Sequence, residues 1–433
     1  MHSFVYRNGE LYCEQVPVKE LARRHGTPLY LYSQETLAGH FSRLDQALQP
    51  VDHRICFAVK ANSNAAILRL LASLGSSFDI VSEGELRRVL VAGADATRCV
   101  FAGVGKTEAE IEFALRRKIY CFNAESEAEL ARINAVAGRL KKIAPVAVRI
   151  NPNIDAHTHA KITTGTYENK FGIQFEQVEA VYARAAKLRH LRWRGVQFHI
   201  GSQLTEAAPF AAAIQKLLPL VRALAARYKL EFFSIGGGLG IVYEPALASG
   251  LPEWWRSPAA RHILTPANYA ASILPLVRDL GLKILIEPGR FIVGNAGLLV
   301  TRVEYVKQTG RKNFVIVDAA MNDLIRPAFY DSYHEIVPVS QRSNGELISS
   351  DVVGPICESG DYFCKDRLLP KVKEGDYLAL LSAGAYGFAM ASNYNSRAFA
   401  AEVLVHGRRA AVIRRRQRLE EIWAAESQPA WLR

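Results

Sequence analysis

The sequence predicts an α/β fold with two parts, a barrel of alternating strands and helices and a second domain built from strands. Three observations support this prediction. The chain has 433 residues, which is more than one hydrophobic core usually organises. Between about residues 55 and 288, short apolar runs alternate with longer amphipathic stretches, as in βα units. Past Arg290, strand-like runs follow one another with few helical patterns.

The barrel prediction comes from counting the apolar, β-rich runs of the first part. They are ICFAVK, FDIVS, CVFAG, YCFNA, VAVRI, GVQFHI, FFSIGG and KILIEPG. Eight such runs close a TIM-type (β/α)8 barrel. Helix signals lie between them, since Thr107 and Glu110 have the spacing of a capping box. Two connections, residues 151–172 and 239–265, are longer than a barrel needs, and such loops usually line a site or a partner.

The second part contains the strand-like runs LLVTRVEYV, FVIVDAA, YLALLSA and AAEVLVHG, separated by turns. At the other end of the chain, FVYRNGELYCEQV has the pattern of a hairpin around Asn8 and Gly9. We therefore expect a barrel over residues 29–284 and a C-terminal all-β domain over residues 285–433 that also takes in residues 1–28.

Composition argues against several classes of protein. No run of about 18 apolar residues predicts a membrane span, and MHSFVYRNGELYCEQVPV lacks the apolar core of a signal peptide, so we expect a cytoplasmic protein with no membrane partner. Lys and Arg outnumber Asp and Glu by 54 to 42, but the excess is dispersed, and its densest cluster, Arg408–Arg418, has no interleaved aromatics. No nucleic-acid partner is expected. The six cysteines form no CxxC pair and lack His partners at metal spacing, so neither a metal nor a disulfide is expected.

Reactive side chains stand where the predicted strands end. Lys60 ends the first run, Asp79 and Ser82 lie on the second, His199 ends the sixth and Glu287 ends the eighth. In barrels of this type the reacting groups lie at the carboxyl ends of the strands. A lysine buried there has a lowered ammonium pKa and can form a Schiff base. Taken alone, Lys60 is explained better as a strand-end lysine whose ammonium reaches solvent.

Other residues of the same predicted rim suit a planar, phosphorylated cofactor. The glycines Gly236–Gly238 of SIGGGLG let backbone N–H groups approach a phosphate, with help from the Ser202 hydroxyl, although a plain tight turn explains the glycines equally well. Glu287 follows an apolar run and needs a cationic partner, either a protonated pyridine nitrogen or Arg290. Beside these groups, His199 is explained better by stacking on a planar ring than as a core histidine.

Several motifs together resemble the diaminopimelate decarboxylase family of pyridoxal-phosphate enzymes. They are FAVKANSN, FDIVSEGEL, HIGSQ, GGGLGI, EPGR, MNDLIRPAFY, VGPICESGD and GAYGFAMASNYNSR. The resemblance spans nearly the whole chain. Some motifs are shared with the wider group of barrel-type pyridoxal-phosphate decarboxylases, whereas MNDLIRP with PICESGD is more specific to the diaminopimelate branch. The resemblance implies decarboxylation of meso-2,6-diaminopimelate to L-lysine and carbon dioxide, the last step of lysine biosynthesis.

The resemblance also implies roles for individual residues. Lys60 forms the Schiff base with pyridoxal 5'-phosphate, His199 stacks on its ring, and Glu287 faces its pyridine nitrogen. Cys357 of ICESGD supplies the proton to the carbon that has lost its carboxylate, although without the family it would be taken for an inert thiol. The predicted cofactor-binding residues are Lys60, Asp79, His199, Ser202, Gly236, Gly237, Gly238, Glu287, Pro288, Gly289, Arg290 and Tyr386.

Substrate choice depends on the distal end of diaminopimelate, which carries a carboxylate as well as an ammonium group. Arg326 can bind this carboxylate through paired N–H donors, with Arg290 and Tyr330 beside it, while Glu358 meets the ammonium. A surface salt bridge is the alternative explanation of Arg326. The predicted substrate-binding residues are Arg290, Arg326, Tyr330, Cys357, Glu358 and Tyr386.

In the family the ICESGD loop completes the site of a second subunit, so the resemblance implies a head-to-tail homodimer with shared sites. Two other functions stay open. One is a decarboxylase of another diamino acid or of a carboxylated polyamine, and Arg326 argues against simple diamino acids. The other is a non-catalytic pyridoxal-phosphate-binding protein on the same barrel, which would have no need of ICESGD or GAYG.

Overall fold

The structure is a computed structural model that describes residues 1–154, 170–341 and 346–432. The chain folds into two compact units. The barrel unit comprises Ala38–Ile241 and His262–Ile292. The β unit comprises Met1–Leu37, Val242–Arg261 and Val293–Arg433.

Eight parallel strands form the closed barrel predicted from the sequence. Each strand pairs with the next in the order β9, β11, β12, β13, β5, β6, β7, β8, and β8 pairs again with β9, which closes the ring. Each of the eight apolar runs supplies one strand. The strands are β5 (His53–Ala58), β6 (Ser77–Ile80), β7 (Cys99–Phe101), β8 (Cys121–Ala124), β9 (Ala144–Asn151), β11 (Leu191–Phe198), β12 (Phe232–Ser234) and β13 (Lys283–Ile286), and the short β10 (Ile173–Gln174) adds to β9.

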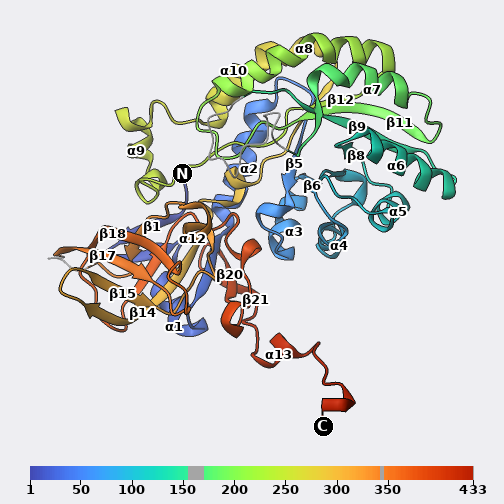
Figure 1. Cartoon of the computed structure of the whole chain (residues 1–433). Helices are drawn as coiled ribbons and strands as arrows, with labels where there is room; N and C mark the ends of the chain where they lie inside the picture. Colours follow the sequence, from blue (N-terminus) through green and yellow to red (C-terminus); the bar gives the residue numbers. More distant parts are fainter. Residues whose placement is uncertain (155–169, 342–345, 433) are drawn as a thin grey trace. The chain divides into compact units, whose positions relative to one another are not determined.

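Helices cover the outside of the barrel strands (Figure 1). The predicted capping box is present: the Thr107 hydroxyl accepts the Glu110 N–H, and the Glu110 carboxylate accepts the Thr107 N–H, so two of the free N–H groups at the start of α5 are satisfied. The helices are α2 (Gln34–Leu48), α3 (Ala65–Ser73), α4 (Glu83–Val91), α5 (Glu108–Arg116), α6 (Glu127–Arg139), α7 (Val178–Ala185), α8 (Ala208–Tyr228) and α10 (Pro266–Val277).

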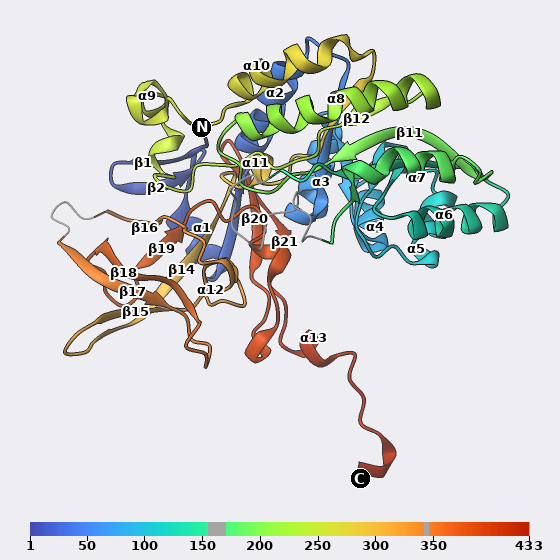
Figure 2. The same ribbon diagram turned by 45° about the horizontal axis from the view of Figure 1, so that its top comes forward.

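Among the described helices, α8 is long and apolar enough to cross a membrane by length and composition. Its place in the fold explains this character. Figure 2 shows α8 beside α10, and α8 also contacts β11. One face of the helix is buried, with Phe210, Ile214, Leu217 and Val221 spaced as an amphipathic helix requires. We therefore interpret α8 as a helix that covers the barrel.

The inside of the barrel changes from apolar to polar along its strands. An apolar layer contains Cys56, Val100, Cys121, Ala147, Phe232 and Leu285, all fully buried. Side chains two residues apart along a strand face the same side of a sheet. Two residues beyond four members of this layer come Asn123, Arg149, Ser234 and Glu287. The polar side chains at the carboxyl ends of the strands therefore rest on an apolar layer beneath them.

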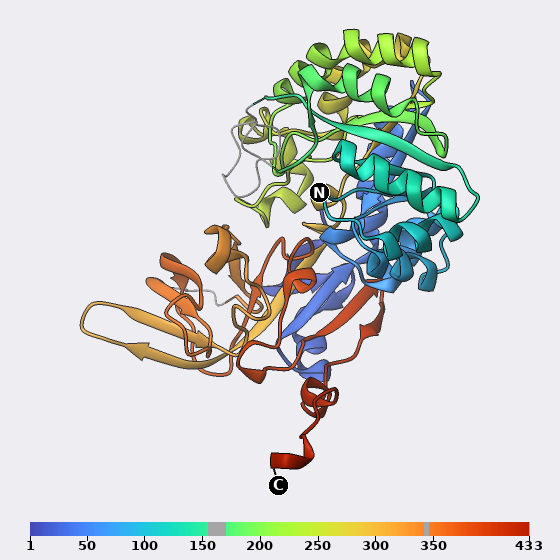
Figure 3. The same ribbon diagram turned by 45° about the vertical axis from the view of Figure 1, so that its right-hand side comes forward.

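The β unit consists mainly of strands, as the sequence predicts. Its large sheet has the order β18-β17-β15-β14-β4-β20-β21, and β16 and β19 pair beside β14. Figure 3 shows β14 and β15 as a long antiparallel hairpin. The strands are β4 (Leu29–Ser33), β14 (Gly297–Gln308), β15 (Asn313–Val317), β16 (Ile336–Pro338), β17 (Leu347–Val353), β18 (Tyr362–Pro370), β19 (Tyr377–Leu380), β20 (Ala401–His406) and β21 (Arg409–Arg414).

The N-terminal hairpin is also present in the β unit. Strands β1 (Phe4–Arg7) and β2 (Glu10–Cys13) pair antiparallel around Asn8 and Gly9, which both have positive φ as the turn requires. The short β3 (Val16–Pro17) completes this small sheet. The unit's short helices are α1 (Val18–His25), α9 (Pro252–Arg256), α12 (Arg326–Tyr330) and α13 (Glu420–Trp423), while α11 (Arg290–Val293) lies where the barrel unit ends. The predicted fold class, a barrel with a C-terminal all-β part that includes the N-terminus, is confirmed.

The two units differ from the expected ranges 29–284, 1–28 and 285–433 at three places. Strand β4 pairs with β14 and β20 in the β unit, although residues 29–33 were expected in the barrel. All five side chains of β4 are buried. Its sequence therefore has no alternation of apolar and polar residues from which the sheet it joins could be predicted. Residues 242–261 belong to the β unit, and residues 285–292 belong to the barrel unit because the chain continues from β13 into α11.

Candidate functional site

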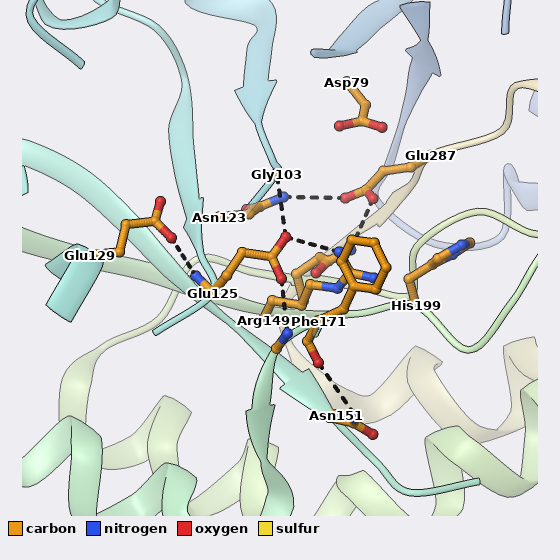
Figure 4. A network of polar contacts seen from close by, with 12 residues as sticks. Asp79, Gly103, Asn123, Glu125, Glu129, Arg149, Asn151, Phe171, His199 and Glu287 are labelled. Carbon is orange, nitrogen blue, oxygen red and sulfur yellow. Dashed lines mark hydrogen bonds and ion pairs between the residues drawn. The ribbon is translucent and has the colours of Figure 1, made fainter. Parts of the chain in front are cut away.

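The barrel unit places its predicted site residues at the carboxyl ends of its strands. Asp79 lies on β6, and His199 and Glu287 directly follow β11 and β13. The glycine loop follows β12, and Lys60 lies in the single 3-10 turn Val59–Ala61 after β5. Figure 4 shows Asp79, His199 and Glu287 around the polar network at this end. These are the positions at which barrels of this type hold their reacting groups.

Lys60 forms an ion pair with Asp79, and the two side chains differ in burial. Asp79 is 1% exposed, whereas the Lys60 side chain is 42% exposed. Of the two explanations of Lys60, a buried amine and a strand-end lysine whose ammonium reaches solvent, the structure shows the second, because β5 ends at Ala58 and the lysine lies in the following turn. Burial therefore cannot be the reason why the Lys60 amine would be reactive. The structure instead places a carboxylate directly beside Nζ, which accepts its hydrogen bond and holds the side chain in place.

Glu287 is a buried carboxylate that accepts hydrogen bonds from three barrel strands. The Ser234 hydroxyl donates to Oε1 at 2.7 Å, Gln197 Nε2 donates to Oε2 at 3.0 Å, and Asn123 Nδ2 approaches Oε1 at 3.5 Å. Burial, together with the negative charge of Asp79, raises the pKa of Glu287 to about 7. A cation placed against this carboxylate would lower that pKa and stabilise the ionised form.

His199 accepts a hydrogen bond at Nδ1 from the Gly237 N–H, 3.3 Å away. Burial, followed by the nearby positive charges of Arg149 and Lys60, lowers the pKa of His199 to about 3. The imidazole is therefore neutral at physiological pH, with its proton on Nε2. A neutral, flat ring can stack on another aromatic ring without adding positive charge beside it.

The glycine loop and Arg290 form an anion-binding set of donors. A side chain at Gly236, which has a φ of 69°, would lie 2.2 Å from the Phe198 carbonyl, and one at Gly237 would lie 2.2 Å from the Glu287 carbonyl. Close approach of the β11 and β13 ends therefore requires glycine. Arg290 is buried and donates to the Ser202 hydroxyl at 3.2 Å, which leaves the serine proton free to donate to an anion.

The remaining predicted cofactor residues of the barrel unit fix the chain around this loop. The Pro288 carbonyl accepts the Ala58 N–H at 3.0 Å, which ties the segment after β13 to the end of β5. A side chain at Gly289 would lie 2.9 Å from Ala61 and 3.1 Å from Ala58. Glycine at 289 thus allows the Arg290 segment to lie against the turn that carries Lys60.

Sequence reasoning missed an ion pair at this end of the barrel in which both side chains are buried. Arg149 Nη1 bonds Glu125 Oε1 at 2.9 Å, and both side chains are buried. Glu125 also accepts the N–H groups of Gly103 at 3.2 Å and Gly172 at 2.9 Å, while the Arg149 guanidinium lies 4.7 Å from the Phe171 ring centroid (Figure 4). The available signal was a charged residue at an inward position of the run VAVRI. Asn123, Gln197 and Ser234 give a related signal, a polar residue within an apolar run, and were also missed.

In the β unit, Arg326 is the first residue of α12 and is 5% exposed. Its guanidinium donates to the Tyr243 hydroxyl at 2.9 Å and to the Ser332 hydroxyl at 3.0 Å. The alternative of a surface salt bridge for Arg326 is therefore wrong. Tyr330 ends the same helix and is partly buried. These hydroxyl partners hold the guanidinium in place, and a guanidinium is the side-chain group best suited to bind a carboxylate through two N–H donors.

Cys357 and Glu358 lie in an exposed loop of the β unit. The Cys357 N–H donates to Asn395 Oδ1 at 3.2 Å, and the Tyr394 hydroxyl donates to Glu358 Oε2 at 3.1 Å, so two loops of this unit meet here. Tyr386 is partly buried and has a φ of 57°, an uncommon value for a tyrosine. Strained backbone conformations cluster at functional sites, although several turns of this chain also have positive φ.

A cavity of about 380 Å³ lies at the opposite end of the barrel strands and contains none of the predicted site residues. Its lining is basic, but Glu231 pairs with Arg192 and Arg194, and Lys142 caps the end of α5 through the Leu115 carbonyl at 2.8 Å. Positive charges at the carboxyl ends of helices are stabilised by the helix dipole. Its lining residues are Leu115, Lys118, Ile119, Lys142, Ile143, Pro145, Arg192 and Arg194.

Comparison with known proteins agrees with this geometry. Residues 34–294 match the family described as pyridoxal-dependent decarboxylase, pyridoxal binding domain. The chain is 50% identical to a diaminopimelate decarboxylase from Vibrio cholerae, over 99% of both chains, and 48% identical to one from Pseudomonas aeruginosa, again over 99% of both. These relatives extend over the β unit as well as the barrel.

Solved structures give the same result. A diaminopimelate decarboxylase from Helicobacter pylori complexed with L-lysine has a TM-score of 0.87 and 42% identity, covering 94% of this chain and 98% of that chain. One from M. jannaschii in co-complex with L-lysine has a TM-score of 0.91 and 34% identity, covering 100% and 99%. The chain belongs to the pyridoxal-dependent decarboxylases and, within them, to the diaminopimelate decarboxylase family.

Proposed function

We propose that this protein removes one carboxylate from meso-2,6-diaminopimelate to give L-lysine and carbon dioxide, with pyridoxal 5'-phosphate as its cofactor. The observation that carries the proposal is the buried Glu287 carboxylate beside His199, Arg290 and the Lys60–Asp79 pair, in a chain whose full-length relatives are diaminopimelate decarboxylases. We also propose that the reaction takes place in the cytoplasm, where its product would serve lysine biosynthesis.

The barrel unit has the donors and the charge that pyridoxal phosphate needs. Arg290 and Ser202, beside a loop with no room for a Cβ, suit a phosphate dianion. Glu287 lacks a cation in its immediate hydrogen-bond set and would find one in a protonated pyridine nitrogen. When bound, the cofactor supplies the electron sink that receives the electrons of the broken carbon–carbon bond.

We assign Lys60 Nζ as the covalent attachment point of the cofactor. Nζ must lose a proton before it can attack an aldehyde, and Asp79 Oδ2 is the adjacent acceptor. Asp79 is buried at 1% exposure, so its carboxylate is held rigidly and fixes the position of Nζ through the ion pair. Neutral His199 orients the cofactor by stacking, and it adds no charge that would compete with the Glu287 contact.

Substrate recognition is assigned to residues of the β unit and to Arg290 of the barrel unit. Arg326 binds the distal carboxylate through its guanidinium, and Arg290 and Tyr330 assist it. Glu358 accepts the distal ammonium, and Tyr386 contacts the cofactor or the substrate. After carbon dioxide leaves, the Cys357 thiol delivers its proton to the α-carbon.

Exposure of Cys357 and Glu358 fits an active form with two subunits. In a head-to-tail homodimer, the loop that carries both residues completes the site of the partner subunit. Each subunit would then depend on the other for its proton donor.

The direct test is product formation from a panel of diamino acids. The protein loaded with pyridoxal phosphate should release one lysine and one carbon dioxide from each meso-diaminopimelate, and neither carbon dioxide nor diamine from L-lysine or L-ornithine. Turnover of L-ornithine or L-lysine in preference to meso-diaminopimelate would overturn the proposed substrate.

A further inference from the structure

We infer that Ser234 and Gln197 are positioning residues that fix the Glu287 carboxylate and keep it ionised for its contact with the cofactor nitrogen. The inference rests on the proposed function, because it takes Glu287 to face that nitrogen. Neither residue is among the predicted substrate-binding or cofactor-binding residues, and neither belongs to the motifs by which the family was identified.

The geometry of the two bonds fixes the plane of the carboxylate. Ser234 ends β12 and Gln197 lies on β11, and each is 1% exposed. The serine binds Oε1 and the glutamine binds Oε2, so the two oxygens are held from different strands. The Glu287 N–H donates to the Gly236 carbonyl at 2.8 Å, which fixes the backbone as well. Rotation of the side chain would break at least one of these bonds.

The serine proton is directed at the carboxylate by a third contact. The Gly236 N–H approaches Ser234 Oγ at 3.4 Å, so the serine oxygen is an acceptor there. Its own hydrogen remains to be donated to Glu287 at 2.7 Å. A carboxylate that receives donors on both oxygens favours the ionised form, since a protonated acid would turn one of its oxygens into a competing donor.

These donors oppose a strong tendency of Glu287 to take up a proton. Burial and the Asp79 charge raise its pKa, whereas the Ser234 bond, Lys60 and Arg149 lower it. Among the titratable groups near Glu287, His199 stays neutral, and burial keeps the Cys56 thiol protonated. Ser234 and Gln197, like Asn123, bind Glu287 without carrying a charge, so they can be replaced without adding or removing one.

Unused acceptors in the same layer indicate that the network is arranged around the carboxylate. Asn123 Oδ1, Gln197 Oε1 and Asp79 Oδ1 are buried and have no hydrogen-bond partner among the described residues. A network that served packing alone would be expected to satisfy its buried acceptors. Here the amide N–H groups of both Gln197 and Asn123 are directed at Glu287 while their oxygens are left over.

The test measures cofactor affinity against pH by absorbance titration of the cofactor-free protein. Ser234→Ala and Gln197→Leu should each bind pyridoxal phosphate about tenfold more weakly at pH 7, since a hydrogen bond to a charged group is lost. The pH below which affinity falls should move upward by about one unit, because the proton on Glu287 is then held more tightly. Ser234→Thr, which keeps the hydroxyl, should behave like the unmodified protein.

Controls separate this inference from the proposed function and from misfolding. Asn123→Leu removes the longest of the three contacts and should have the smallest effect. Glu287→Gln should bind the cofactor weakly, and its affinity should no longer fall as the pH is lowered. If this variant binds the cofactor normally, the proposed role of Glu287 fails. If Glu287→Gln is impaired while Ser234→Ala and Gln197→Leu bind as the unmodified protein does at every pH, the positioning role is overturned. Should Gln197→Leu fail to fold, Gln197→Met carries the same test with an unbranched side chain.

Discussion

The barrel unit and the β unit hold their predicted site residues in contrasting ways. In the barrel unit, Glu287 and Asp79 are buried, and strand ends supply their hydrogen bonds or ion pair. In the β unit, Cys357 and Glu358 are exposed and contact one other loop. Side chains that are already held in position need not rearrange when a ligand binds. Side chains on loops can instead adapt to a substrate or to a second subunit. The contrast agrees with the roles proposed above, in which the barrel unit holds the cofactor and the β unit selects the substrate.

The variant with the largest expected effect tests whether the barrel unit holds the cofactor. Lys60→Ala should abolish the imine absorbance of the bound cofactor and lower turnover by about 10³-fold or more, since the nucleophilic amine is lost. Absorbance spectra and carbon dioxide release measure both. Lys283→Ala, at the amino end of β13, is the matched control and should retain both signals. Retention of the imine absorbance in Lys60→Ala would show that another amine holds the cofactor.

The next effect tests whether the β unit governs substrate rather than cofactor. Arg326→Ala should lower turnover of meso-diaminopimelate by about 10²- to 10³-fold, because a substrate carboxylate loses its bidentate donor. Cofactor absorbance should not change. The exposed Arg302→Ala serves as control. Equal loss of cofactor binding and turnover in Arg326→Ala would contradict the division of roles.

Cys357→Ala should keep the imine absorbance and lose about 10²-fold in turnover, the scale of a missing proton donor. Mixing it with Lys60→Ala provides a test of the shared site. Random exchange of subunits in a head-to-tail dimer should restore about a quarter of the unmodified activity, because half of the dimers are mixed and each of those has one intact site. No recovery after verified subunit exchange would show that Cys357 acts within its own subunit.

The smallest effect concerns the stability of the cofactor-free barrel. The pKa of Glu287 rises from 4.5 to about 7 on folding, so the folded state binds the additional proton and stability falls as pH rises through this window. The free energy of unfolding of the unmodified protein should therefore fall, relative to that of Glu287→Gln, by about 1–3 kcal/mol when the pH is raised from 5 to 8. Thermal unfolding at both pH values measures this difference. Bound pyridoxal phosphate should reduce it, and a constant difference at both pH values would contradict the assigned pKa.

The barrel was predictable because each strand leaves a contiguous apolar run and each reacting residue follows one. The sheet of β4 was not, since LYLYS is buried on both faces and has no alternation to indicate its neighbours. The turn that carries Lys60 was also not predicted, because the sequence does not show that β5 ends two residues before it. The run ICFAVK suggests that Lys60 is the last residue of the strand, whereas Lys60 lies in the short turn that follows the strand.

The polar layer that supports Glu287 could have been found with one more step. Asn123, Arg149 and Ser234 each follow an inward apolar residue by two positions, as Glu287 does. The polar layer is indicated by several polar residues at equivalent positions in separate strands. A search for isolated motifs does not detect such a pattern. The bonds between them could not be predicted, because the stagger of the strands decides which side chains meet.

The attachment of the cofactor to Lys60 is the claim on which the mechanism depends most. Borohydride reduction of the protein loaded with pyridoxal phosphate, followed by proteolysis and mass spectrometry, tests it directly. The account predicts one phosphopyridoxyl group per chain, located on Lys60 in the peptide that contains FAVKANSN. A group on any other lysine, or reduction that leaves no covalent adduct, would contradict it.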